Sequence, residues 1–187
     1  MPRAFDILIA AIALAILSPV LLAAAIAIRL TSRGPVIYRQ RRVGLGGREF
    51  EMWKLRTMVQ GSDPVGVGKV VYRDDPRVTG PGRLLRRTSL DELPNLVNVL
   101  RGEMAIVGPR PTIKAQVDDY TPQQKRRHEV LPGITGWAQV QGRAGILWEE
   151  RIELDVWYVD HRSFALDLRI LAKTLWLVLT GQGLAPD

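Results

Sequence analysis

The sequence contains no cysteine among its 187 residues. Disulfides, thiolate zinc sites and cysteine nucleophiles are therefore excluded. Its two histidines, His128 and His161, do not form a paired-histidine metal motif, and no Walker P-loop is present. Internal repeats and low-complexity linkers are also absent. The length suits one compact domain, with residues to spare for an additional membrane element.

Charge is missing from the segment between Ile7 and Ile28. About 20 apolar residues suffice for a helix to cross a bilayer. A secretory signal peptide is the alternative, and the alanines near the end of the run offer small residues for cleavage. However, only Arg3 precedes the run, Asp6 adjoins it, and the run is longer than an ordinary signal core. We therefore expect a membrane element.

Ser18 and Pro19 lie near the middle of this apolar run. Proline removes a backbone donor and clashes with the preceding turn, so the helix should bend here. Ser18 can hydrogen-bond to a carbonyl that the proline leaves free, and a kinked helix can then still span the bilayer. The bend can equally return the chain to the face from which it entered. Hydropathy leaves both arrangements open, with a spanning helix as the general expectation.

Acidic residues are fewer than basic ones, 19 against 26, and the net charge is +7. This excess indicates an anionic partner, which is a nucleic acid, a phospholipid or a phosphorylated substrate. Five arginines follow the apolar run: Arg29, Arg33, Arg39, Arg41 and Arg42. Arginines so close to a membrane segment favour the cytoplasmic side and anionic headgroups. We therefore expect the main domain in the cytoplasm.

Strand-forming residues flank the glycine-rich segment 43–47. This pattern predicts a β-hairpin with strands over 35–42 and 48–56. The stretch 60–81 has glycines and prolines but weak periodicity, and we expect a surface loop long enough to be functional. A second loop is expected over 102–111, which ends in Gly-Pro-Arg-Pro.

Helices are expected in the rest of the chain, so the predicted fold class is α+β and helix-rich. They cover 88 or 89 to about 100, 121 to about 131, 147 to about 161, and 164 to 180. Thr121, Pro122 and Gln124 form a strong helix start, and Ser163 is expected to cap the last helix. This last helix is apolar but carries charges that exclude a spanning segment. It is either a core helix or an amphipathic helix at the membrane interface, with Trp157, Tyr158 and Trp176 near the headgroups.

Asp91 and Glu92 are the main candidates for chemistry. Ser89 with Glu92 fits a helix capping box, and this alone is a sufficient structural explanation. The surroundings suggest more, because arginines 83, 86, 87, 101 and 110 flank the pair. Arginines at a helix start can hold phosphate groups. Two adjacent carboxylates among them can bind magnesium, attack phosphorus, or do both.

Four longer stretches carry a resemblance to a known family. They are WKLRTM (53–58), TSLDELPNLVNVLRGEMAIVGPRP (88–111), RRHEVLPGITGWAQVQGR (126–143) and ELDVWYVDHRS (153–163). Together they resemble the bacterial sugar transferase family, in its subgroup of small monotopic phosphoglycosyl transferases. The resemblance covers nearly the whole chain, with the motifs in the same order.

The resemblance implies that Asp91 attacks the β-phosphate of a UDP-sugar and keeps the phosphosugar while UMP leaves. Polyprenyl phosphate, expected to be undecaprenyl phosphate, then takes the phosphosugar in the first membrane step of glycoconjugate synthesis. Asp91 and Glu92 would hold Mg²⁺. Candidate phosphate-binding residues are Lys54, Arg56, Arg87, Arg110 and Arg143.

The resemblance also implies a re-entrant helix over residues 1–30, broken at Ser18-Pro19, with both ends at the cytoplasmic face of the bacterial inner membrane. Residues 31–187 would form the catalytic domain. Gln141 departs from the asparagine expected at its position, and the loop 60–72 is distinctive and bears on the choice of sugar. The sugar, the glycan pathway, the polyprenol length and the oligomeric state stay open, a homo-oligomer included.

Other polar and aromatic residues have ordinary explanations. His128 is expected to be structural or to face headgroups, and His161 to lie at the surface. Asp155 and Asp160 are surface residues or further carboxylates of the site, and Trp137 is a core residue or a platform for uracil.

Two other function classes compete with an enzyme. A nucleic-acid-binding protein would leave the apolar segment unexplained and would need an aromatic platform that is missing. We therefore expect no nucleic acid as a partner. A membrane scaffold would leave the two carboxylates among the arginines unexplained.

Overall fold

The computed structural model describes residues 1–62, 75–142 and 147–180, and it has the helix-rich α+β architecture that the sequence predicts. The first half contains α1 (Arg3–Thr31), β1 (Ile37–Val43), η1 (Leu45–Gly47), β2 (Glu49–Leu55), α2 (Gly80–Arg87), η2 (Leu90–Glu92) and α3 (Asn95–Arg101). The second half contains β3 (Ala105–Val107), α4 (Lys114–Val117), α5 (Pro122–Lys125), η3 (Arg126–His128), β4 (Gly133–Thr135), α6 (Trp137–Gly142), α7 (Trp148–His161) and α8 (Phe164–Thr180).

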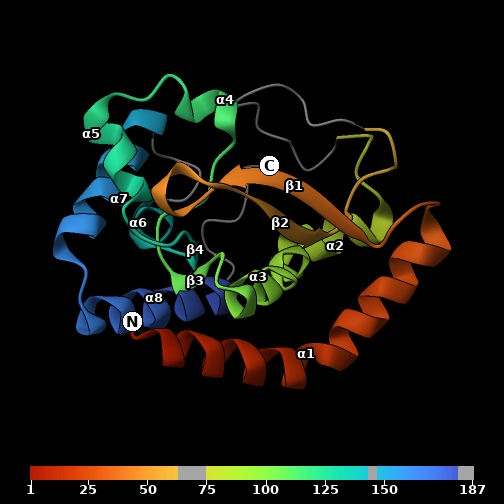
Figure 1. Cartoon of the computed structure of the whole chain (residues 1–187). Helices are drawn as coiled ribbons and strands as arrows, with labels where there is room; N and C mark the ends of the chain where they lie inside the picture. Colours follow the sequence, from red (N-terminus) through yellow and green to blue (C-terminus); the bar gives the residue numbers. More distant parts are fainter. Residues whose placement is uncertain (63–74, 143–146, 181–187) are drawn as a thin grey trace.

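The N-terminal helix α1 is bent, and its two limbs run along the underside and one flank of the molecule (Figure 1). Pro19 lies inside the helix and has no N–H to donate to the carbonyl of Ala15, four residues earlier. The Ser18 hydroxyl donates to that carbonyl at 2.8 Å instead. The predicted bend and the predicted role of Ser18 are therefore both confirmed. Within the described residues, α1 is the one helix long and apolar enough to cross a membrane.

Both limbs of α1 pack against the rest of the protein. Ala10, on the first limb, is fully buried in the main core with residues from α3, β3, α6, α7 and α8. On the second limb, Ala24 and Ile28 form a smaller core with Leu55 and Leu85. Both limbs are therefore attached to one folded body.

The first turn of α1 is also held by polar contacts. The buried Asp6 carboxylate accepts a hydrogen bond from the amide of Ile106 at 3.0 Å. Arg3 donates to the carbonyl of Met104 at 2.9 Å. These bonds give partners to main-chain groups of β3 and of the residue before it, both of which are buried.

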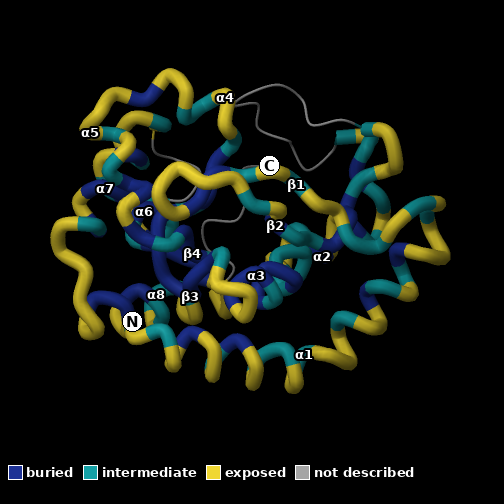
Figure 2. The backbone as a smooth tube through the Cα atoms, viewed as in Figure 1, coloured by how far each residue is buried: buried dark blue, intermediate teal, exposed yellow. Residues whose placement is uncertain are grey.

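Exposed residues recur along the outer side of both limbs of α1 (Figure 2), and a row of large apolar residues is among them. The row consists of Ile7, Leu8, Ile12, Ile16, Val20, Leu22, Ile26 and Leu30. Helix α8 lies beside the first limb, where Phe5 and Phe164 meet edge to face at 5.6 Å. It buries Ile170 and Leu177 in the core but exposes Trp176 and other apolar residues. The core expectation is therefore confirmed for one face of the helix, and the interface position stays a prediction for the exposed face.

The headgroup-level position expected for Tyr158 is wrong. Its side chain is buried, and its hydroxyl donates to Asp167 of α8 at 2.7 Å. Trp157 and Trp176 are partly exposed, 39% and 51%. Tyr158 shares its helix with Trp157 but lies on the face that packs against the core.

The predicted hairpin is confirmed as β1 and β2, which pair antiparallel with Tyr38 opposite Lys54 and Arg42 opposite Phe50. Directly opposed residues share a face of an antiparallel pair. Tyr38, Gln40, Arg42 and Lys54 are therefore on one face. At the edge of β2 that faces away from β1, the Trp53 amide donates to the Asn98 side chain of α3 at 3.0 Å. This bond fixes the hairpin against that helix.

Two predicted boundaries are wrong. Residues 102–111 are not all loop, because Ala105–Val107 form β3, which pairs in parallel with β4. The helix expected from Thr88 or Ser89 begins only at Asn95, after the short turn η2. In the expected 60–81 loop, α2 already begins at Gly80, and residues 63–74 lie outside the described residues.

The last two helices match their predictions, whereas the helix expected from Thr121 to about Leu131 is divided into the short helices α5 and η3. Thr121 and Gln124 form the predicted capping box at the start of α5. The helix η3 ends at His128, ahead of Leu131, and α7 and α8 span the predicted ranges. The Ser163 hydroxyl accepts from the Leu166 amide at 3.2 Å, as expected of a cap. The short helix α6 was not predicted.

Candidate active site

Asp91 and Glu92 lie in η2, a single turn between α2 and α3. Ser89 precedes them in the left-handed region, with φ of 56°, and its side chain makes no capping hydrogen bond. The capping-box explanation for Ser89 and Glu92 is therefore wrong. Since a residue other than glycine is costly in this conformation, the tight turn is a specific feature that presents the two carboxylates.

Glu92 is held by two cations from separate elements. Lys54 of β2 donates to Oε1 at 2.9 Å, and Nη1 of Arg110 donates to Oε2 at 3.1 Å. Nη2 of Arg110 also contacts Oε1, which makes the Arg110 contact bidentate. Burial on its own raises the pKa of Glu92. The charges of Arg110 and Lys54 and their hydrogen bonds outweigh burial and hold this pKa below its usual range.

Asp91 is in the opposite situation. Its carboxylate has no hydrogen-bond partner in the part of the chain that the structure describes. Burial and the negative charge of Glu92 raise the pKa of Asp91 to about 6, while Lys54, Arg110 and Arg86 oppose the shift. The dyad therefore combines one neutralised carboxylate with one whose oxygens are available to a ligand.

Sequence reasoning missed two cations of this neighbourhood as site residues. Arg86, in the last turn of α2, is close enough for its charge to lower the pKa of Asp91. Arg42 shares the strand face of Lys54, and burial together with the charge of Arg110 lowers its pKa to about 10. The hairpin register puts Arg42 on the same face as Lys54, with Arg42 opposite Phe50 and Lys54 opposite Tyr38, but that register is fixed only by the turn over 44–48.

Of the other predicted phosphate-binding residues, the two that the structure describes, Arg56 and Arg87, are not brought to the dyad. Arg56 is buried and donates to the carbonyls of Ser32 and Arg33 at 2.9 and 2.6 Å, where it fastens the end of α1. Arg87 is exposed at the end of α2. Arg143 lies outside the described residues, and so does most of the 60–72 loop. Gln141 accepts a hydrogen bond from Lys173 of α8 at 2.9 Å.

The histidines have structural positions. His128 is buried and stacks on Tyr120, and burial together with the charge of Arg127 lowers its pKa to about 4. His161 is exposed and stacks on Trp157 with 4.3 Å between ring centroids. The structural and surface roles expected for them are confirmed.

Trp157 also stacks on Trp137, whose ring packs against the main core, so the core role of Trp137 is the one observed. Neither aspartate of α7 joins Asp91 and Glu92. Asp160 pairs with Arg126 at the surface, whereas Asp155 is fully buried and pairs with Arg127. The surface role expected for Asp155 is therefore wrong.

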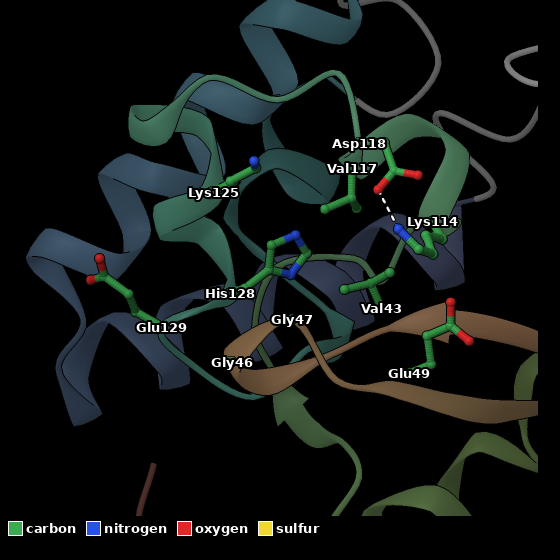
Figure 3. A pocket seen from close by; sticks show the side chains of 10 residues that line it. All are labelled: Val43, Gly46, Gly47, Glu49, Lys114, Val117, Asp118, Lys125, His128 and Glu129. Atoms are coloured by element: carbon green, nitrogen blue, oxygen red, sulfur yellow. Dashed lines mark hydrogen bonds and ion pairs between the residues drawn. The ribbon is translucent and has the colours of Figure 1, made fainter.

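A separate hollow of about 570 Å³ lies between the hairpin turn, α4 and the α5–η3 segment (Figure 3). Val43 and Val117 form apolar parts of its wall, and Lys114 and Asp118 pair at its rim. Neither Asp91 nor Glu92, nor any other predicted site residue, lines this hollow. The chemistry suggested by the sequence therefore belongs to the dyad.

A magnesium ion fits the dyad through Asp91. Mg²⁺ is commonly held by one or two carboxylates together with substrate phosphates. Asp91 offers unbonded oxygens, whereas Glu92 would have to release Lys54 or Arg110 to become a second ligand. Among the described residues, no three His, Asp or Glu side chains cluster into a ready-made metal site. The protein alone therefore supplies part of a coordination shell.

Comparisons with known proteins identify the family. The model of the bacterial sugar transferase family matches residues 1–181. The uncharacterized sugar transferase EpsL of Bacillus subtilis is 47% identical, over 97% of this chain and 89% of its own length. A UDP-glucose:undecaprenyl-phosphate glucose-1-phosphate transferase of Caulobacter vibrioides is 45% identical, over 95% of this chain and 69% of its own length.

A third relative is longer. The UDP-N-acetylgalactosamine-undecaprenyl-phosphate N-acetylgalactosaminephosphotransferase of Aeromonas hydrophila is 43% identical over 97% of this chain, which spans 44% of that protein. The relatives thus differ in length and in the sugar that their names specify, while the matched region is the same. The chain belongs to the bacterial sugar transferase family.

Proposed function

We propose that this protein transfers a sugar 1-phosphate from a UDP-sugar to a polyprenyl phosphate, releasing UMP. The names of the relatives from Caulobacter vibrioides and Aeromonas hydrophila support this reaction class, with undecaprenyl phosphate as acceptor. Because those names specify different sugars, they leave the sugar of this protein open. The observation that carries the proposal is the pairing of an available Asp91 with a neutralised Glu92.

In the first step, an oxygen of the Asp91 carboxylate attacks the β-phosphorus of the UDP-sugar. A new O–P bond forms as the bond to the UMP oxygen breaks, and UMP departs with the electron pair. In the second step, a phosphate oxygen of the acceptor attacks the same phosphorus and the bond to Asp91 breaks. Asp91 returns as a carboxylate, and the product is a polyprenyl diphosphate sugar. Splitting one displacement into two is the ordinary purpose of a carboxylate nucleophile.

The cations around the dyad suit this chemistry because phosphoryl transfer depends on alignment and charge neutralisation. Arg110 and Lys54 neutralise Glu92, which keeps a second negative charge from repelling the incoming diphosphate. Arg86 and Arg42 add positive charge nearby. Mg²⁺ held by Asp91, with Glu92 as a further ligand, would neutralise charge on the phosphate oxygens.

The bent helix suits a reaction between a soluble donor and a lipid acceptor. We propose that α1 enters and leaves the bilayer at the cytoplasmic face of the inner membrane, as a re-entrant helix. The bend at Pro19 and the packing of both limbs on one body support this arrangement. Leu90, next to Asp91, packs against the small core that contains Ala24 and Ile28 of the second limb, so the dyad is close to the membrane helix.

Turnover tests the proposal. Purified protein in nanodiscs would be mixed with Mg²⁺, undecaprenyl phosphate and a panel of UDP-sugars, and UMP would be quantified. We expect UMP with at least one sugar, a loss of at least about 1000-fold in Asp91→Asn, and abolition by EDTA. UMP release that is equal in wild type and Asp91→Asn would refute the assignment of the nucleophile. Glu49→Gln, a substitution on the exposed hairpin end, is the matched control.

A further inference from the structure

We propose that Arg127, supported by Asp155, is a positioning residue that fixes the main chain of Arg110 and thereby directs the Arg110 side chain onto Glu92. The proposal rests on the proposed function only for its effect on turnover. Its structural part, the anchoring of Arg110, stands on contacts within the described residues.

Arg127 is a buried arginine that makes contacts in three directions. Its guanidinium pairs with Asp155 of α7, and both side chains are almost completely buried. Nη1 donates to the hydroxyl of Tyr120 at 2.7 Å. Nη2 also donates to the main-chain carbonyl of Arg110 at 2.9 Å. The third contact connects the pair to the site, because the Arg110 side chain forms the bidentate bond to Glu92.

The segment around Arg110 is fastened at its ends by the main chain and in its middle by Arg127. The Gly108 amide donates to Thr135 at 2.9 Å, the Gly133 amide donates to Pro109 at 2.9 Å, and the Val43 amide donates to Thr112 at 2.8 Å. Among the described residues, the hydrogen bond from Arg127 is the one that reaches the main chain of Arg110 itself. Loss of that bond would free the middle of the segment and thereby weaken the main-chain hydrogen bonds at its ends.

A contribution to stability alone does not explain why the buried pair of Arg127 and Asp155 is charged rather than apolar. A buried ion pair is often no more stabilising than apolar residues of similar volume, because both charges lose their hydration. A second arginine–aspartate pair, Arg126 with Asp160, already joins η3 to α7 at the surface. What distinguishes Arg127 is the additional donor that it directs at the Arg110 carbonyl, which an apolar residue lacks.

The chain offers a matched control in this second pair. Arg126→Lys and Arg127→Lys change neighbouring residues of η3, and each removes the fork of an arginine facing an aspartate of α7. Of these two arginines, Arg127 is the one that donates a hydrogen bond to Arg110. Should Arg127→Lys fold poorly, the double variant Arg127→Met/Asp155→Leu removes both charges together and avoids an unpaired buried one.

Two measurements test the proposal. The first is hydrogen–deuterium exchange of the Val43 and Gly133 amides, which are bonded to the Arg110 segment. We expect about tenfold faster exchange of these amides in Arg127→Lys, as for the loss of one hydrogen bond to a charged group. Amides of α8 should keep their wild-type rates, and so should all amides in Arg126→Lys. Unchanged exchange at Val43 and Gly133 in both Arg127 variants would overturn the anchoring, whether or not turnover is detected.

The second measurement is a double-mutant cycle on kcat/KM for the UDP-sugar, with Arg127→Lys and Arg110→Lys alone and together. We expect Arg127→Lys to lower kcat/KM by about 10- to 100-fold, because a displacement of about 1 Å can cost that much. In the Arg110→Lys background the same change should have less than about a threefold effect. Fully additive effects would show that Arg127 does not act through Arg110. Absence of turnover in the wild type would instead refute the proposed function, and the exchange measurement alone would then decide.

Discussion

Asp91 and Glu92 are neighbours in the chain, yet their surroundings prepare them for different tasks. Glu92 is an anion bonded to Lys54 and Arg110, which keeps its pKa below the usual range. Asp91 is partly buried without a hydrogen-bond partner among the described residues, which raises its pKa. A pair of acids whose pKa values are pushed apart is a common arrangement in active sites. Here the difference supports the proposed roles of Asp91 as the nucleophile and Glu92 as the residue that organises the cations.

The raised pKa of Asp91 predicts the acid limb of the pH profile. Because the nucleophile must be deprotonated, kcat/KM should fall as the pH drops through about 6. Lys54 is a positive charge that favours the Asp91 carboxylate, so Lys54→Met should move the limb to higher pH, by about one unit. Initial rates of UMP release between pH 4.5 and 9 measure this. A limb that stays in place in Lys54→Met would contradict the electrostatic account.

Ser89 gives a stability prediction that separates a strained turn from a helix cap. Its φ of 56° is costly for serine but not for glycine, so Ser89→Gly should raise the free energy of unfolding by about 1 kcal/mol. Ser89→Ala should be nearly neutral, because no capping bond is lost. Thermal unfolding in detergent compares the two. A loss of about 1 kcal/mol in Ser89→Ala, without a gain in Ser89→Gly, would instead indicate a capping role.

At the residue scale, the sequence predicted the members of the site better than their contacts. The dyad, Lys54 and Arg110 are together, as expected from the motifs that contain them. Arg56 lies two residues from Lys54, but the strand ends at Leu55 and the chain beyond it carries Arg56 toward the end of α1. Such a change in side-chain direction at a strand end has no local sequence signal. The same holds for Asp155, whose partner Arg127 comes from a separate element.

At the element scale, the short parallel pair β3–β4 depends on close contact between main chains. A Cβ on Gly133 would lie 2.1 Å from the amide nitrogen of Gly108. We therefore expect Gly133→Ala to lower the free energy of unfolding by about 1–3 kcal/mol, as overpacking commonly does. Gly80→Ala is the control, since a Cβ there meets no atom within 4 Å. Equal stability of the two variants in denaturant unfolding would contradict the close approach.

Elements with a local signal were predictable, and elements that depend on distant partners were not. The glycine-rich turn specified the hairpin, and the Thr121 capping box specified a helix start. The strand β3 covers only three residues, which is too short for a periodic pattern to be detected. Its partner β4 follows in the chain only after α4, α5 and η3. The turn η2 was mistaken for a helix start because Ser89 and Glu92 have the spacing of a cap. Ser89 makes no capping hydrogen bond, and Glu92 instead pairs with Lys54 and Arg110 from distant parts of the chain.

For the whole molecule, the central question is how α1 sits in the membrane. A re-entrant helix places Pro2 and the catalytic domain on the same side. The absence of cysteine allows single labels, so Pro2→Cys and Leu147→Cys, both at exposed positions, report on the two sites. We expect an impermeant maleimide to label both in inside-out vesicles and neither in intact cells. Labelling of Pro2→Cys from outside the cell would show a spanning helix instead.

The molecule as a whole combines a bent apolar helix with a charged site whose neighbour Leu90 packs against the same small core as the second limb. The bend follows from Pro19, and the apolar outer row follows from the composition of the segment. The hydropathy of the segment left spanning and re-entrant arrangements open, because it carries no information on what the two limbs contact. Packing of both limbs on one body is a tertiary feature, and it favours the re-entrant arrangement.

The most direct test of the account is the intact mass of the protein after incubation with its UDP-sugar and Mg²⁺ in the absence of polyprenyl phosphate. Transfer through Asp91 predicts an adduct with the mass of the phosphosugar, which disappears when the acceptor lipid is added and never forms in Asp91→Asn. No adduct at any time in protein that releases UMP once the acceptor lipid is added, or an adduct that persists in Asp91→Asn, would contradict the central claim.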